Sequence, residues 1–194
     1  MSGVLLLSFA GCSKDSFTDI YAFTYYYNKF TDECRLSLED YLLHNGTYST
    51  VLEKNGIRLH LALKEADNGK IEEIRLLAAK VDEMGNKRDI TAAECGFFCE
   101  RLRAVLSAYT TLGEEGCEAI IGDMRLENPS QFSSEGELTL TKGEWHTVYY
   151  SNALASVFTV TNIHLRPVEK TEKPASKPDF GNTAYTREEN KKRT

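Results

Sequence analysis

The residues best suited to chemistry in this sequence are its five cysteines and four histidines, and their spacing matches no catalytic or metal-binding motif. The cysteines form no CxxC pair: they are Cys12, Cys34, Cys95, Cys99 and Cys117. The histidines are scattered along the chain at His44, His60, His146 and His164. The chain also lacks the patterns GxGxxG, GxxxxGK[ST], HExxH and GxSxG. We therefore predict no catalytic residue, no metal site and no cofactor.

Several weaker arrangements of residues could support thiol or acid–base chemistry. Cys95 and Cys99 lie four residues apart on one helical face, but no histidine or acid joins them there, and free cysteine is commonly buried. We interpret both as core residues. A nucleophilic pair of Cys34 with His60 stays open, although no local motif supports it. The paired acids Glu72-Glu73 and Glu114-Glu115 are expected on exposed elements, where they favour solubility.

Length and charge limit the class of protein. A chain of 194 residues is long enough for one ordinary core. The net charge is −6, and segment 166–194, with eight basic and five acidic residues, is basic, so the rest of the chain is clearly acidic. An acidic body argues against nucleic-acid binding, which needs a basic surface. Segment 166–194 also holds three of the four prolines, and we predict a disordered charged tail.

The first residues carry a targeting signal. A short apolar run ends in Phe9-Ala10-Gly11-Cys12, which resembles the lipobox of bacterial lipoprotein precursors. That resemblance implies that residues 1–15 form a signal and anchor segment, that Cys12 is acylated with fatty acid, and that the protein is extracytoplasmic and held at a bacterial membrane. The run is too short to span a bilayer. The alternative is a soluble cytoplasmic protein with an apolar N-terminal strand.

The clearest structural signal is a meander over 47–82. Its turns are Asn55-Gly56 and Asp67-Asn68-Gly69, residue types that tolerate the positive φ of tight hairpins. Between them the sequence alternates, with one face apolar and the other carrying Arg58, His60 and Lys64. This alternation predicts an antiparallel sheet with one buried face and one wetter face.

Helices are expected before and after this meander. Segment 16–30 has apolar residues at helical spacing, with Ser16 and Asp19 as its cap and Phe30 on the buried stripe. Its many tyrosines also favour a strand, but we predict a helix. Thr91 and Glu94 match a capping box. The helix that follows has a buried stripe and places Glu100, Arg101 and Arg103 off it. A second helix over 113–123 and a loop over 127–134 come next.

Three more strands are predicted over 136–141, 145–151 and 155–163, repeating the order of helix and meander. The fold class is therefore α+β, with two helix-plus-three-strand units, at 16–82 and 91–164, forming one antiparallel sheet with helices on one face. The units belong to a single domain, 16–165, and their origin by duplication is left open. This layout is similar in outline to the β-lactamase-inhibitor-protein fold, whose concave sheet binds a protein partner.

These observations favour a non-enzymatic binding module. Helices on one face leave the other face of the sheet open, and we expect a protein or peptide partner to dock there. The predicted binding face consists of Arg58, His60, Lys64, Trp145 and Tyr149. Within the last strands Val148 and Tyr150 compete with these aromatics for the core. The alternative function is a soluble hydrolase or thiol enzyme whose residues meet only in space.

Overall fold

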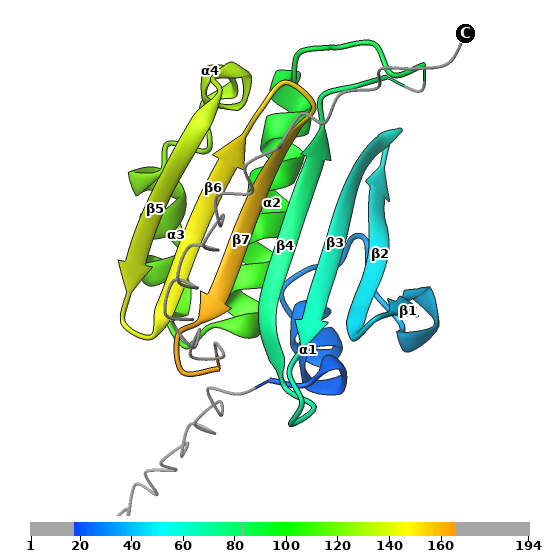
Figure 1. The fold of residues 1–194 in the computed structure, drawn as a ribbon, viewed down its shortest axis with the longest axis vertical. Coiled ribbons are helices and arrows are strands. Elements are labelled where there is room, and N and C mark those ends of the chain that lie inside the picture. The colour runs from blue at the N-terminus through cyan, green and yellow to red at the C-terminus, as the bar shows by residue number, and fades with distance from the viewer. Residues whose placement is uncertain (1–17, 83, 166–194) are drawn as a thin grey trace, which may run out of the picture.

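The chain folds into two layers, a sheet and a set of helices on one of its faces (Figure 1). The computed structural model describes residues 18–82 and 84–165. In the view of Figure 1 the sheet lies in front, and the helices α1, α2 and α3 lie behind it. The predicted α+β class is confirmed. The anchor segment 1–15 with Cys12 and the tail 166–194 lie outside the described residues.

The sheet has seven antiparallel strands in the order β1-β2-β3-β4-β7-β6-β5. In chain order the strands are β1 (Leu42–His44), β2 (Thr47–Lys54), β3 (Ile57–Glu65), β4 (Ile71–Ala79), β5 (Gly136–Lys142), β6 (Trp145–Ser151) and β7 (Ala155–Asn162). The last strands of the two predicted units, β4 and β7, pair along seven residues in the middle of the sheet. The two meanders therefore form one continuous sheet.

The hairpin turns adopt the conformation that their residues predict. Asn55 and Gly56 have φ values of 54° and 79°, as a type I′ turn requires. Asn45 and Gly46, at 47° and 69°, form a second turn of this kind. That turn joins β2 to β1, an edge strand that was not among the predicted strands. A second Asn-Gly pair was the signal for the missing strand.

The helical layer consists of α1 (Ile20–Tyr27), α2 (Ala92–Tyr109), α3 (Gly113–Asp123) and α4 (Pro129–Ser133), with a 3₁₀ turn, η1 (Leu38–Asp40). The predicted capping box is present, because Thr91 Oγ1 accepts from Glu94 N at 3.2 Å and Thr91 N donates to Glu94 Oε2 at 2.8 Å. The range predicted for α3 is confirmed. The predicted loop 127–134 is wrong in part, because Asn128 caps α4 and Pro129 begins it.

Helix α1 is shorter than its sequence signal. Asp19 caps it by accepting from Ala22 N at 2.9 Å, and Phe23 and Tyr27 are buried as expected. Phe30 does not join this stripe and is 54% exposed, because the helix ends at Tyr27 and helical spacing no longer applies. Ser16, the other proposed cap, lies outside the described residues.

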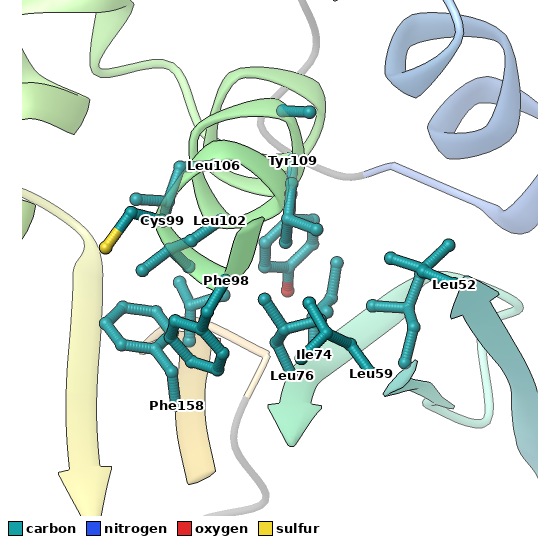
Figure 2. Close-up of a cluster of buried hydrophobic side chains, with 14 of the residues drawn as sticks. Leu52, Leu59, Ile74, Leu76, Phe98, Cys99, Leu102, Leu106, Tyr109 and Phe158 are labelled. Carbon is teal, nitrogen blue, oxygen red and sulfur yellow. The ribbon is translucent and has the colours of Figure 1, made fainter. Parts of the chain in front are cut away.

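The core lies where α2 packs onto the middle of the sheet (Figure 2). The predicted stripe of α2 is fully buried: Cys95, Phe98, Cys99, Leu102, Val105, Leu106 and Tyr109. Opposite it stand apolar residues of β3, β4 and β7, among them Leu61, Leu76 and Phe158, which are paired across the three strands. Tyr109 points toward the sheet in Figure 2, and its hydroxyl donates to Ile71 O at 2.8 Å.

Arg101 was expected on the exposed side of α2, and this expectation is wrong. Its side chain is 2% exposed and lies between α2 and the segment after α1. It donates to Thr31 Oγ1 at 2.5 Å and Glu33 O at 2.7 Å, and it pairs with Glu100. These acceptors replace the water that a buried guanidinium loses. Burial raises the pKa of the neighbouring Tyr27 to about 12, although Arg101 acts in the opposite direction.

Replacement of Leu61 by alanine should lower the free energy of unfolding by about 2–5 kcal/mol, because Leu61 is 0% exposed and the change leaves a cavity. The matched control is Leu42→Ala on edge strand β1, since Leu42 is 75% exposed. That change should stay within about 0.5 kcal/mol of wild type. Urea unfolding of both variants measures the difference, and equal losses would contradict the placement of the core.

Candidate functional site

We call the face of the sheet opposite the helices, which lies in front in Figure 1, the open face. It carries three rows of side chains that cross six strands. The register defines the rows, since opposite residues on paired strands share one side of the sheet. The first row is Val51, His60, Leu77, Val157, Tyr150 and Glu137. The second is Ser49, Ala62, Arg75, Thr159, Val148 and Thr139. The third is Thr47, Lys64, Glu73, Thr161, His146 and Thr141.

The first row is the most apolar of the three rows on the open face. Tyr150 is 45% exposed and Val51 is 37% exposed, while Leu77 and Val157 between them are half-buried. His60 interrupts the row and is exposed. Four apolar side chains from four strands thus line up across the sheet, although helix packing makes no use of them. An aligned apolar band on a sheet face is suited to contact with another surface.

The predicted cations of the open face are confirmed as exposed, and each has an acidic partner. Arg58 Nε lies 3.4 Å from Glu53 Oε2 across the β2–β3 pair. Lys64 Nζ lies 2.5 Å from Glu72 Oε1. The hydrogen bond with Glu72 raises the pKa of Lys64. These cations therefore form a mixed-charge surface rather than a positive patch.

The expectation that Glu72 and Glu73 form an exposed acid pair is wrong, because Glu72 is 6% exposed and Glu73 is half-buried. Lys64 pairs with Glu73 and Glu65 pairs with Ile71, so Glu72 is the extra residue of a β-bulge. The bulge turns both acids toward the open face, where Glu72 meets Lys64 and Glu73 lies 2.5 Å from Arg75. Glu114 and Glu115 are exposed, as expected.

Trp145 and Tyr149 do not belong to the open face, which corrects the predicted binding face. They are 0% and 1% exposed and point toward the helices. The Trp145 ring packs against Tyr109 at 4.9 Å, and its Nε1 donates to Thr111 Oγ1 at 3.2 Å. Tyr149 packs against the Phe132 ring at 5.6 Å. Their neighbours His146, Val148 and Tyr150 take the places on the open face.

The residues of β6 alone do not show which of its two faces is buried, because both faces carry an aromatic side chain. Tyr149 and Tyr150 differ by one position and therefore lie on opposite sides. The deciding signal is the pairing with β7, which sets Tyr149 opposite Phe158 in the core and Tyr150 opposite Val157 on the open face. Trp145 lies on the same side of the strand as Tyr149, because the two residues are four positions apart.

The described cysteines are all free, and the structure places them outside the open face. Cys95 and Cys99 donate to Leu126 O at 3.1 and 3.2 Å and are buried, which agrees with a core role. Burial raises the pKa of Cys95, and it raises that of Cys99 to about 12. Cys34 is half-buried at a φ of 53° and donates to Glu53 O at 3.2 Å. No hydrogen bond joins it to His60, so the proposed thiol pair gains no geometric support.

A groove of ≈ 730 Å³ runs along the helical layer between α2 and α3. Its lining includes Phe30, Ala104 and Cys117, with Arg103 among the polar side chains. Arg103 pairs with Glu118 at 2.6 Å and with Glu127. Arg103, the cation in the lining of the groove, is therefore already paired with two carboxylates, and what the groove offers is mainly apolar surface. Within residues 18–82 and 84–165, no group of three histidines, cysteines or acids is placed to hold a metal ion.

Among the cysteines of the described residues, Cys34 should be modified first when the native protein is alkylated with a maleimide. Cys95, Cys99 and Cys117 should react at least about tenfold more slowly, because all three are buried and the raised pKa values of Cys95 and Cys99 leave less thiolate. Peptide mapping by mass spectrometry resolves the sites. Denaturation should make all four equally reactive. Fast native labelling of Cys95 or Cys99 would contradict the core assignment.

The open face is thus defined by geometry, with Arg58, His60 and Lys64 confirmed on it and with Tyr150 and Val148 replacing Trp145 and Tyr149. None of the helices formed by the described residues is long and apolar enough to cross a membrane. No protein-family model, no curated protein and no solved structure matches this chain.

Proposed function

We propose that this protein is a non-enzymatic binding module whose open face docks a protein partner. The observation that carries the proposal is the first row, in which Val51, Leu77, Val157 and Tyr150 line up across four strands. Apolar side chains on a strand face are normally covered. Among the described residues the helices cover the opposite face instead, which leaves this row for an external surface.

The chemistry of the open face favours a protein as partner. Its charges are arranged as neighbouring opposite pairs, Arg58 with Glu53 and Lys64 with Glu72, so the face lacks the excess positive charge that binds nucleic acid. An apolar band bordered by paired charges matches the usual anatomy of a protein interface, with an apolar centre and a polar rim. Tyr150 is the aromatic side chain in this band and the expected anchor.

Photo-crosslinking in the host cell tests this docking surface. A benzophenone amino acid at position 150 should give one discrete protein adduct, and the same residue at Tyr25 should not, because Tyr25 is 58% exposed but lies on α1. The adduct at position 150 should be lost in Leu77→Lys, which places a charge inside the apolar row. Circular dichroism checks that this variant is folded.

A binding constant decides whether the adduct reports docking. The partner recovered from position 150 should bind the purified protein, and Leu77→Lys should weaken the Kd about fivefold or more, as expected for loss of a contact worth above 1 kcal/mol. Lys142→Ala, a change at the end of edge strand β5, serves as the matched control and should leave the Kd unchanged. Equal binding by wild type and Leu77→Lys would exclude the first row as the docking surface.

We further propose that Cys12 tethers this module to the extracytoplasmic side of a bacterial membrane. The support is the lipobox-like Phe9-Ala10-Gly11-Cys12 at the end of a short apolar run. In this arrangement the lipid supplies the attachment, and the acidic body is free to present its open face.

Metabolic labelling with an alkyne analogue of palmitate tests the tether. Wild-type protein expressed from its complete reading frame should incorporate the label and sediment with membranes. Cys12→Ala should lose both, whereas Cys34→Ala should keep both, since Cys34 lies in the folded body and bonds to Glu53 O. Labelling of Cys12→Ala at the wild-type level would refute the proposed tether, and it would not bear on the proposed docking surface.

A further inference from the structure

Lys80 is a buried amine at the end of the sheet. It directly follows β4, and its backbone is fixed by hydrogen bonds from Lys80 N to Leu154 O at 2.7 Å and from Arg88 N to Lys80 O at 2.8 Å. The residue is 5% exposed. Its Nζ donates to Ser151 Oγ at 2.6 Å, which joins the end of β4 to the end of β6.

The partner of this amine is unusual, because Ser151 is neutral. Ser151 Oγ donates in turn to Phe132 O at 3.2 Å, and Ser156 Oγ lies 3.4 Å from the Ser151 oxygen. No carboxylate of the described residues lies within ion-pair distance of Lys80 Nζ. A buried ammonium without a carboxylate is costly, so burial favours the neutral amine. Burial accordingly lowers the pKa of Lys80, and the nearby carboxylates of Glu135 and Asp89 act against this shift.

The same amine lines a small polar pocket. The pocket has a volume of ≈ 230 Å³, and Lys80 shares it with Lys87, Asp89, Glu135 and Asn152. Lys87, Asp89 and Glu135 are exposed, whereas Lys80 is buried, so Lys80 forms the inner wall and the charged residues form the rim. The pocket lies at the end of the sheet, apart from the first row of the open face.

We propose that Lys80 is a nucleophilic amine that captures a small aldehyde or ketone in this pocket as an imine. Three features of the site support the proposal: an amine held by a neutral hydroxyl, a pocket of small-molecule size beside it, and two carboxylates at the rim. A desolvated lysine is the usual nucleophile for carbonyl compounds. The inference is independent of the docking face and assigns the chain a second, small-molecule site.

The capture step needs no reagent beyond the carbonyl compound. The neutral Nζ attacks the carbonyl carbon, a C–N bond forms as the C=O π bond breaks, and a proton passes from nitrogen to oxygen to give a carbinolamine. The hydroxyl then takes a proton from solvent and leaves as water, the nitrogen lone pair forms the C=N bond, and a rim carboxylate, Glu135 or Asp89, accepts the remaining proton from nitrogen. The product is an imine, with no change in oxidation level. Addition of water reverses the sequence, so capture is reversible.

Reductive trapping on the full chain tests the proposal. The protein is incubated at mildly alkaline pH with glyoxylate, or separately with propanal, and cyanoborohydride reduces any imine to a stable secondary amine. Peptide mapping should find Lys80 modified severalfold faster than Lys87, because burial lowers the pKa of Lys80 and so raises its neutral fraction. Lys87 is the matched control because it lines the same pocket and is exposed. Faster trapping with glyoxylate than with propanal would show that the site prefers an anionic carbonyl compound.

Two variants separate a reactive amine from a structural one. Lys80→Arg replaces the amine by a guanidinium, which stays protonated and is no nucleophile for a carbonyl carbon, so trapping at this position should be abolished. Ser151→Ala removes the hydroxyl that holds Nζ and should change the trapping rate of Lys80 but not of Lys87. If Lys80 is modified no faster than Lys87, or only after denaturation, the lysine is structural and the proposal is overturned. Labelling of Ser151 by a fluorophosphonate would also overturn it, because Lys80 would then act as a base for the serine. Wild-type mapping decides the question even if a variant does not fold.

Discussion

The pairing of β4 with β7 is the interaction on which the rest of this structure depends. Seven residues of each strand are paired, from Glu73 with Thr161 to Ala79 with Ala155, and this ladder joins the two meanders into one sheet. It also brings Leu76 and Phe158 side by side under α2. Without it each half would expose an unpaired strand edge and lose part of the surface on which the long helix packs.

This pairing also determines which residues lie on each face of the sheet, because one register sets both faces. A slip of one residue between β4 and β7 would move Phe158 out of the core and Val157 into it. The core under α2 strongly disfavours such a slip, because burial of large apolar side chains is the dominant stabilising contribution. The first row of the open face, which includes Leu77 and Val157, is therefore held in place by contacts on the opposite side of the sheet.

Arg101 and Lys80 are both buried basic side chains, but their hydrogen-bond partners differ. The two terminal nitrogens of Arg101 donate to acceptors of Thr31, Glu33 and Glu100, although its buried Nε has no partner among the described residues, and these bonds hold the segment after α1 against α2. Lys80 has the neutral Ser151 as its hydrogen-bond partner, with Glu135 and Asp89 at a greater distance. A guanidinium stays charged in nearly any environment, whereas an amine can give up its proton when it is buried. The same degree of burial thus gives a structural group in one case and a candidate nucleophile in the other.

The sequence by itself determined the class of fold, the Asn55-Gly56 hairpin, the capped helix from Thr91 and the exposed side of β3, because each rests on local periodicity or turn chemistry. It did not determine which tyrosine of Tyr149-Tyr150 is buried, since a strand with an aromatic on each face is settled by its neighbour β7. Nor did it reveal the contact of Lys80 with Ser151, which lie 71 positions apart. Side chains that meet only after β4, β6 and β7 have paired leave no local pattern. Register and long-range burial, and with them both proposed sites, were decided by the tertiary structure.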